Sequence, residues 1–94
     1  MTTPEWYTEQ IEKLEKILEQ DAQNVDALKN LGVIYAQVGK LEDAIAKLEI
    51  AVKIKSDNAS LWNTLGEAYR RSKNFHKANV CRMRAIQLNE ASTA

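Results

Sequence analysis

The chain of 94 residues contains one cysteine, one proline and three glycines, and only 6% of its residues are aromatic. A single cysteine, Cys81, excludes an internal disulfide and any metal site built from several cysteines. Scarce proline and glycine, together with 45% apolar and 28% charged residues, favour helix over disorder or low complexity. A chain of this length fits one domain with one hydrophobic core.

Long apolar runs are also missing, and none approaches the roughly 20 residues that a membrane-spanning helix needs. The first ten residues, MTTPEWYTEQ, lack a basic stretch followed by an apolar segment, so no signal peptide is visible. We therefore expect a cytoplasmic protein that does not contact a membrane.

The charges are balanced overall but separated along the chain. Residues 1–50 carry ten acidic residues against five lysines, a formal charge of −5, whereas residues 51–94 carry three acidic and eight basic residues, a charge of +5. Such a dipole can steer a charged partner or draw the acidic end of one copy toward the basic end of another. The alternative is an ordinary solvated helix surface. A net charge of zero disfavours a protein that mainly binds nucleic acid.

An internal repeat organises the chain. Between the two full units, residues 24–57 and 58–91, a shift of 34 residues superimposes six pairs of identical residues. These pairs are Asn24 and Asn58, Leu31 and Leu65, Gly32 and Gly66, Tyr35 and Tyr69, Ala44 and Ala78, and Ala51 and Ala85. A match at one fixed period indicates a repeat architecture in which neighbouring units share a core.

Apolar residues recur at spacings of three and four in both units, which predicts two amphipathic helices in each. Asn24 and Asn58 precede the first helix of each unit, where an N-cap is expected, and Gly39 stands where a left-handed residue can end a helix. A further turn is expected around residues 72–74. Residues before Asn24 match only the second helix of a unit, so they predict a single N-terminal capping helix.

We thus expect five helices in one domain covering residues 1–94. Its predicted parts are an N-terminal helix at 4–20, one repeat at 24–57, a second repeat at 58–91 and a tail at 92–94.

The octet WNTLGEAY at residues 62–69 resembles the tetratricopeptide repeat, whose signature W-x-x-L-G-x-x-Y precedes small residues in a second helix. In the first unit Leu28 takes the tryptophan position. The resemblance implies an all-α fold, a right-handed superhelical stack of helix-turn-helix hairpins. Gly32 and Gly66 would then allow the second helix of each hairpin to approach closely, with Ala44 and Ala78 meeting them.

The second helix of the second unit departs from that of the first. Asn79 and Arg82 stand where the first unit has Ile45 and Leu48, and such polar residues suit the outer face of a terminal unit. Val80 and Met83 nevertheless form an apolar patch on the same helix, which leaves open self-association or a chain cut from a longer array.

Catalytic groups are sparse, and we expect no enzymatic activity, metal or cofactor. His76 and Cys81 lie five residues apart, which is not the spacing of three or four that places side chains on one helix face. We expect a surface histidine and a buried or half-buried thiol. Trp6 and Trp62 are expected to pack in the cap and the core.

In the resembled family, the first helix of each unit lines a concave groove that binds a peptide or helix of another protein. Side-chain amides can bind a peptide backbone, and guanidinium groups can bind acidic groups. The candidate groove residues are Lys29, Asn30, Val33, Gln37, Asn63, Thr64, Glu67, Arg70 and Arg71.

Three hypotheses remain at this point. The first is a protein–protein interaction module, an adaptor, scaffold or assembly factor that binds a partner segment in the groove. The second is a homo-oligomer joined through its charged ends and the patch at Val80 and Met83. The third is RNA binding, which the zero net charge and the lack of groove aromatics disfavour.

Overall fold

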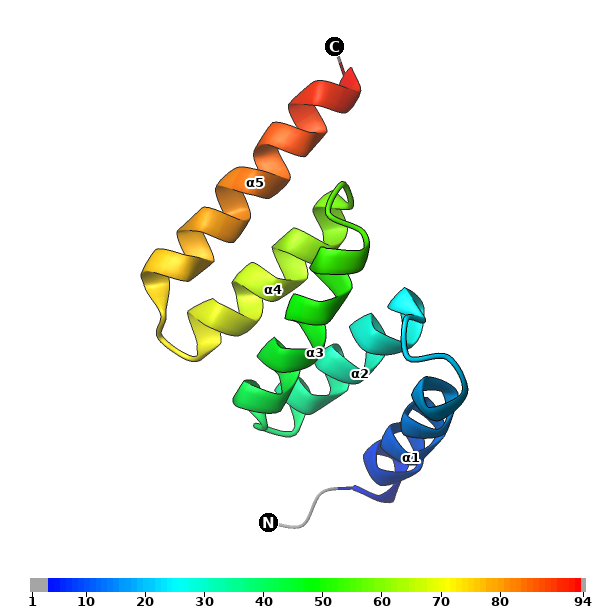
Figure 1. Cartoon of the computed structure of the whole chain (residues 1–94). Coiled ribbons are helices and arrows are strands. Elements are labelled where there is room, and N and C mark those ends of the chain that lie inside the picture. The colour runs from blue at the N-terminus through cyan, green and yellow to red at the C-terminus, as the bar shows by residue number, and fades with distance from the viewer. Residues whose placement is uncertain (1–3, 94) are drawn as a thin grey trace.

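The computed structural model describes residues 4–93, with side chains through residue 91. It contains five helices and no strand within the described residues, so the predicted all-α class is confirmed (Figure 1). The helices are α1 Glu5–Gln20, α2 Val25–Gln37, α3 Leu41–Ile54, α4 Ala59–Arg71 and α5 Phe75–Thr93.

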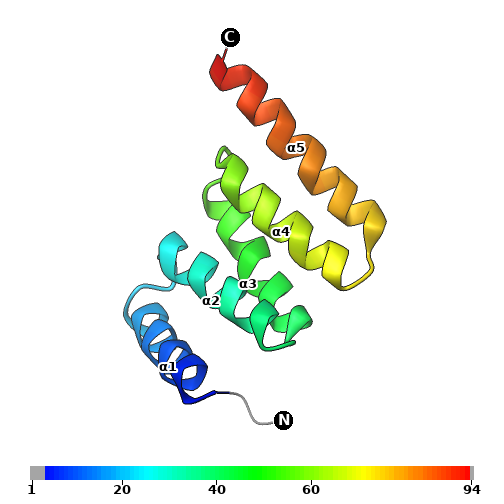
Figure 2. The ribbon, with the colours of Figure 1, turned by 180° about the vertical axis from the view of Figure 1, so that it is seen from behind.

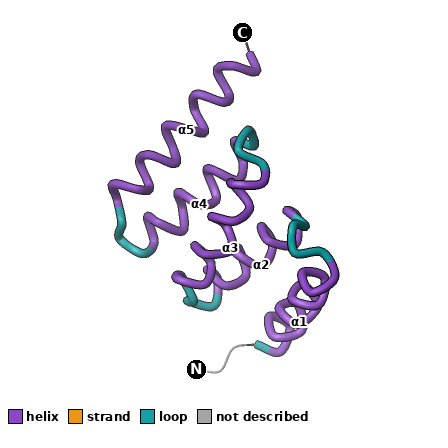
Figure 3. Tube along the Cα trace, in the orientation of Figure 1, coloured by secondary structure: helices purple, strands orange, loops and turns teal. Residues whose placement is uncertain are grey.

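Short turns join the helices, as Figure 3 shows. The bounds of the helices lie close to the predicted ones. The exception is the C-terminal end. Helix α5 continues to Thr93, so residues 92 and 93, which the sequence places in a tail, are helical. No proline or glycine occurs after Gly66, and nothing in the sequence ends the helix earlier.

The predicted caps are confirmed. The side chain of Asn24 accepts a hydrogen bond of 3.0 Å from the Ala27 N–H, and Asn58 accepts one of 3.1 Å from the Leu61 N–H. Each bond satisfies one backbone donor that the first turn of a helix leaves unpaired. Gly39 has a φ of 87°, the left-handed conformation expected of a glycine after a helix.

Lys73 occupies the position of Gly39 in the second unit and also has a left-handed backbone, with a φ of 68°. For a residue with a Cβ this conformation costs roughly 1–2 kcal/mol. We predict that Lys73→Gly raises the free energy of unfolding by about 0.5 kcal/mol, since glycine's larger unfolded-state entropy offsets part of the relief. Urea denaturation followed by circular dichroism measures this. The reverse change, Gly39→Lys, should lower stability, and a loss of stability in Lys73→Gly would contradict the prediction.

The helices form a stack in which neighbours along the chain pack together. Helix α2 packs on α3 and α4 on α5 as two hairpins, while α1 packs on α2 and α3 on α4 (Figures 1 and 2). The molecule is elongated, with principal extents of 43 × 30 × 18 Å. Leu14 and Leu31 belong to a small core between α1 and α2. A larger core contains Leu28, Leu48 and Leu61, which join the two hairpins.

The two repeat glycines lie at close helix contacts, and the expected neighbour Ala78 is found beside Gly66, whereas the nearest neighbour of Gly32 differs from the expected Ala44. A Cβ on Gly32 would lie 2.7 Å from Cγ of Leu48, so Leu48 rather than Ala44 lies nearest to this glycine. A Cβ on Gly66 would lie 3.2 Å from Cβ of Cys81 and 3.3 Å from the carbonyl oxygen of Ala78. The reason is that Leu48 has a large side chain, whereas its counterpart in the second unit, Arg82, points into solvent.

A repeated hydrogen bond joins successive units. The hydroxyl of Tyr35 on α2 donates to Glu15 on α1 at 2.9 Å, and one period later Tyr69 on α4 donates to Glu49 on α3. Burial, aided by Glu15, raises the pKa of Tyr35 to about 12, and burial with Glu49 likewise raises the pKa of Tyr69. The next position in this series is Met83 on α5, which offers no carboxylate to a third unit.

Candidate functional site

Two adjoining hollows mark the face of α4 on which Asn63 and Glu67 lie. One, of about 340 Å³, lies between the hairpins and is bordered by α2, α3 and α4. The other, of about 440 Å³, lies between α4 and α5. Asn63 and Glu67 line both, so the two hollows form one continuous surface, which we call the groove.

Most of the predicted groove residues line these hollows. They are Val33, Gln37, Asn63, Thr64, Glu67, Arg70 and Arg71. Lys29 and Asn30 line neither hollow. Nζ of Lys29 instead donates to Oγ of Ser60 at 3.2 Å, a bond that ties α2 to α4. Asn30 is exposed beside it.

The groove already contains a charge pair. Nε of Arg70 donates to Oε2 of Glu67 at 2.9 Å, and a second nitrogen contacts the other carboxylate oxygen. The hydrogen bond from Arg70 lowers the pKa of Glu67. Because Glu67 holds the Arg70 guanidinium, Arg71 is the better candidate for an acidic group of a partner.

Helix α5 supplies groove residues that the sequence did not predict. Phe75, Asn79 and Arg82 line the second hollow. One period earlier, Ile45 and Leu48 pack in the core against α4. Asn79 and Arg82 therefore lie on the face of α5 where a further helix would pack, which agrees with the polar outer face expected of a terminal unit. The shift of 34 residues, which pairs them with Ile45 and Leu48, could have predicted that α5 contributes to the groove.

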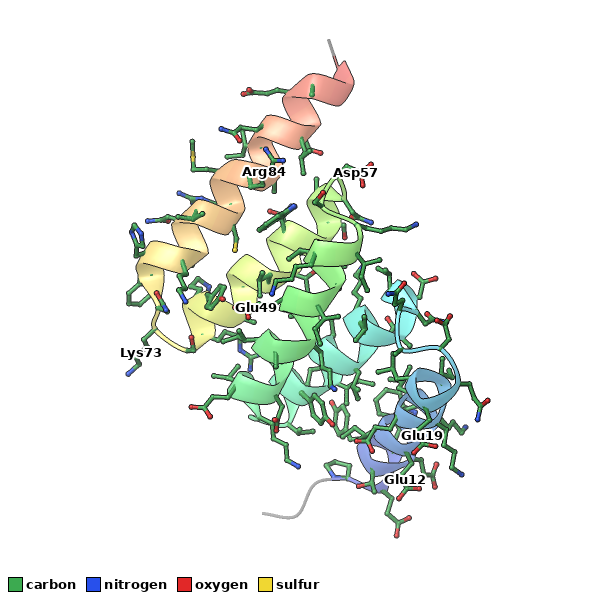
Figure 4. The ribbon with its side chains drawn as sticks, viewed as in Figure 1. Glu12, Glu19, Glu49, Asp57, Lys73 and Arg84 are labelled. Atoms are coloured by element: carbon green, nitrogen blue, oxygen red, sulfur yellow. The ribbon has the colours of Figure 1, made fainter. Side chains whose placement is uncertain are left out.

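A third hollow, larger than the two that form the groove, lies on the other face of α4. It has a volume of about 600 Å³ and runs between α3 and α5, with α4 as its floor; Glu49 of α3, labelled in Figure 4, is one of its lining residues. We call it the junction trough. Its lining residues are Glu49, Val52, Lys53, Ser56, Trp62, Leu65, Tyr69, His76, Lys77, Val80 and Cys81.

His76 and Cys81 both line the junction trough, although a spacing of five does not place them on one helix face. His76 is exposed and Cys81 is 4% exposed, as expected for a surface histidine and a buried thiol. Burial raises the pKa of the Cys81 thiol, which disfavours the thiolate that a nucleophile requires.

The two tryptophans differ. Trp62 packs against the larger core and its Nε1 donates to the carbonyl oxygen of Ser56 at 2.8 Å, as predicted. Trp6 was predicted to pack in the cap but is 56% exposed and contacts Tyr7 edge to face. Within the described residues, no helix precedes α1 on that side.

The predicted self-association residues, Val80 and Met83, are both exposed, at 53% and 52%. Val80 lines the junction trough, whereas Met83 does not, so the two side chains do not share one hollow.

Between residues 4 and 93, no helix is long and apolar enough to cross a membrane. Within the same range, no group of three or more histidine, cysteine, aspartate or glutamate side chains could hold a metal ion.

Comparison with known proteins gives consistent matches. The chain matches three family models of this repeat, two described as "Tetratricopeptide repeat" over residues 13–46 and 59–92, and one described as "TPR repeat" over residues 34–72. It is 44% identical over 43 residues to the chloroplastic tetratricopeptide repeat domain-containing protein PYG7 of Arabidopsis thaliana. It is 34% identical over 61 residues to a TPR repeat-containing protein of Dictyostelium discoideum.

These relatives are much longer than the matched parts. The PYG7 match covers 46% of this chain and 14% of that protein, and the Dictyostelium match covers 65% and 23%. A crystal structure of MamA superimposes on the chain with a TM-score of 0.83 at 23% identity, covering 88% of this chain and 48% of MamA. A second MamA structure gives 0.85 at 22% identity, covering 92% and 49%. Since the family matches together span residues 13–92 and the fold agrees, the chain belongs to the tetratricopeptide repeat proteins.

Proposed function

We propose that this chain is a protein–protein interaction module, an adaptor or scaffold that binds an extended peptide or a helix of a partner in the groove. The observation that carries the proposal is the continuity of the two hollows through Asn63 and Glu67. Their combined lining offers amide, guanidinium and apolar groups from α2, α4 and α5, the mixture that a peptide site requires. The cytoplasmic location expected from the sequence stays a prediction.

Asn63 occupies the centre of this site, because it borders both hollows and is exposed. Its amide can donate to one backbone carbonyl of a bound peptide and accept from one N–H. Arg71 lies at the end of the first hollow, where it can bind a carboxylate. Two units provide a short groove, so we expect modest affinity for a single peptide unless several copies act together.

The test is a selection of displayed random heptapeptides on the immobilised chain, followed by calorimetry of the enriched peptides. Groove binders should bind the variant Asn63→Ala, Arg71→Ala at least about tenfold more weakly. The matched control is Asn30→Ala, Arg84→Ala, which changes the same residue types at exposed positions outside the groove. Equal affinity for the groove variant, with the fold intact by circular dichroism, would rule out this site.

Self-association is a second candidate, favoured by the apolar side chains that α5 exposes, among them Phe75 at 60% and Met83 at 52%. A second copy could pack there as a further unit, helped by the opposite charges of the two halves. Light scattering after size exclusion checks this idea. A species larger than a monomer that dissociates with added salt is expected, and a monomer at all concentrations would contradict it. RNA binding comes last, because Glu67 places a carboxylate in the centre of the groove.

A further inference from the structure

The junction trough is a distinct surface, separate from the groove. Helices α3 and α5 do not pack on one another within the described residues, so Trp62 of α4 remains partly exposed between them. Trp62, Leu65 and Tyr69 of α4 lie along the floor, and the hydrogen bond from Trp62 to Ser56 holds the indole in place. Val80 adds an exposed apolar wall. A volume of about 600 Å³ is enough for one or two large side chains of a partner.

The repeat provides a comparison for this trough, because an equivalent hollow lies one period earlier in the chain, between α1 and α3. That first trough is smaller, about 340 Å³, and is lined by Glu15, Leu18, Glu19, Tyr35 and Lys47. Its Lys47 corresponds to Cys81 in the second trough. Trp62 and Val80 correspond in sequence to the smaller residues Leu28 and Ala46, which do not line the first trough. The second trough therefore has more apolar side-chain surface than the first.

The rim changes its charge between the two troughs. Glu19 of the first trough becomes Lys53 in the second. His76 and Lys77 also line the second trough, whereas the residues one period earlier, Glu42 and Asp43, do not line the first. Lys77 is exposed at the edge, with Nζ 5.5 Å from the centroid of the Tyr69 ring. Glu49 is the one carboxylate among the lining residues, and it accepts the Tyr69 hydroxyl.

A solvated surface without a binding role does not require this pattern. If the second trough were only a gap between helices, its exposed edge could carry a carboxylate at position 53, as the first trough does at Glu19. The second instead combines an apolar floor, including a large aromatic ring, with two lysines and a histidine at its edge. Such a surface complements a segment that carries a large apolar side chain flanked by carboxylates.

We propose that the junction trough binds an acidic segment of a partner protein, with one aromatic or large aliphatic side chain of that segment between Trp62 and Val80, and its carboxylates at Lys53 and Lys77. This deepens the interaction function proposed above but uses another face of α4. Its failure and that of the groove can therefore be distinguished.

The test uses the full chain with Trp6→Phe, which leaves Trp62 as the only tryptophan. Random heptapeptides that lack tryptophan are selected on it and then titrated while Trp62 fluorescence is recorded. Enriched peptides should carry one large apolar residue beside two or more carboxylates, should change the Trp62 emission, and should bind more weakly as salt is added. The variant Lys53→Glu, Lys77→Asp gives two exposed positions the acidic residues that stand one period earlier in the sequence, and it should weaken binding at least about tenfold.

The groove variant Asn63→Ala, Arg71→Ala serves as the control, since it should leave this binding unchanged. Peptides without carboxylates, an unchanged Trp62 emission, equal affinity for the charge-reversed variant, or no enriched peptide at all would each overturn the proposal. Helix α1 exposes Trp6 between Glu5 and Glu9, so a second copy is the competing occupant. Association of the wild-type chain that is lost in both Trp6→Ala and Lys53→Glu, Lys77→Asp would identify that copy and overturn the assignment to a separate partner.

Discussion

Replacing Leu48 with alanine should lower the free energy of unfolding by about 3 kcal/mol. Leu48 is 1% exposed and lies in the core that joins the two hairpins. Its side chain also lies against Gly32, so its loss opens a cavity between α2, α3 and α4 that the backbone cannot easily close. Small domains are stable by only about 5–15 kcal/mol, so this single change would remove a large share of the total.

Arg82→Ala is the matched control, because Arg82 occupies the equivalent position in α5 and its side chain is exposed. Its effect on stability should stay within about 0.5 kcal/mol of zero. Urea denaturation followed by circular dichroism measures the free energy of unfolding of both variants. Differences above roughly 0.3 kcal/mol can be resolved. Similar losses in the two variants would mean that α5 is buried in solution, contrary to the structure.

Alanine at the two repeat glycines should have unequal effects. In Gly32→Ala the new Cβ would lie 2.7 Å from Cγ of Leu48, a buried atom near the middle of its side chain, so the helices must separate. Overpacking of this kind costs about 1–3 kcal/mol, which exceeds the roughly 1 kcal/mol that alanine gains over glycine in a helix. The difference is a net loss of up to about 2 kcal/mol.

In Gly66→Ala the nearest atoms lie at 3.2 and 3.3 Å, a contact that small shifts relieve. The gain in helix propensity, about 1 kcal/mol, should then nearly balance the contact, leaving stability almost unchanged. Thermal and urea unfolding of both variants tests the contrast. Equal destabilisation would show that the two hairpins pack alike despite Leu48 and Arg82.

The parts of the fold that were predictable rest on local chemistry. An asparagine that caps a helix acts on an N–H three residues away, so Asn24 and Asn58 indicated two helix starts without knowledge of the tertiary structure. Gly39 indicated a helix end for the same reason, because its left-handed conformation is a local property. The period of 34 residues then fixed the order of the hairpins.

Features that depend on absent or distant partners were less predictable. Lys73 adopts the conformation of Gly39 although its side chain disfavours it, because the second hairpin repeats the turn of the first. Trp6 is apolar, yet it is exposed because no preceding helix covers its side of α1.

The candidate site divides in the same way. Groove residues on α4 such as Asn63 and Arg71 follow from helical periodicity alone. Lys29 has the right spacing but bonds to Ser60 across the junction, a contact that periodicity cannot reveal. The junction trough draws side chains from three helices, so only the assembled stack brings Lys53 and Lys77 to one rim.

The stacking order also determines how the chain should acquire its structure. Apart from the contact between α2 and α4, each helix packs only on its neighbours along the chain. Contacts between residues close in sequence lose little chain entropy when they form, which is typical of rapid folding. Helices α1 and α5 each have one packing neighbour, whereas α2, α3 and α4 have more. Amide protons should therefore exchange fastest at the two ends and slowest in the middle three helices, so the trough and groove would lose their α5 walls before their α4 floor.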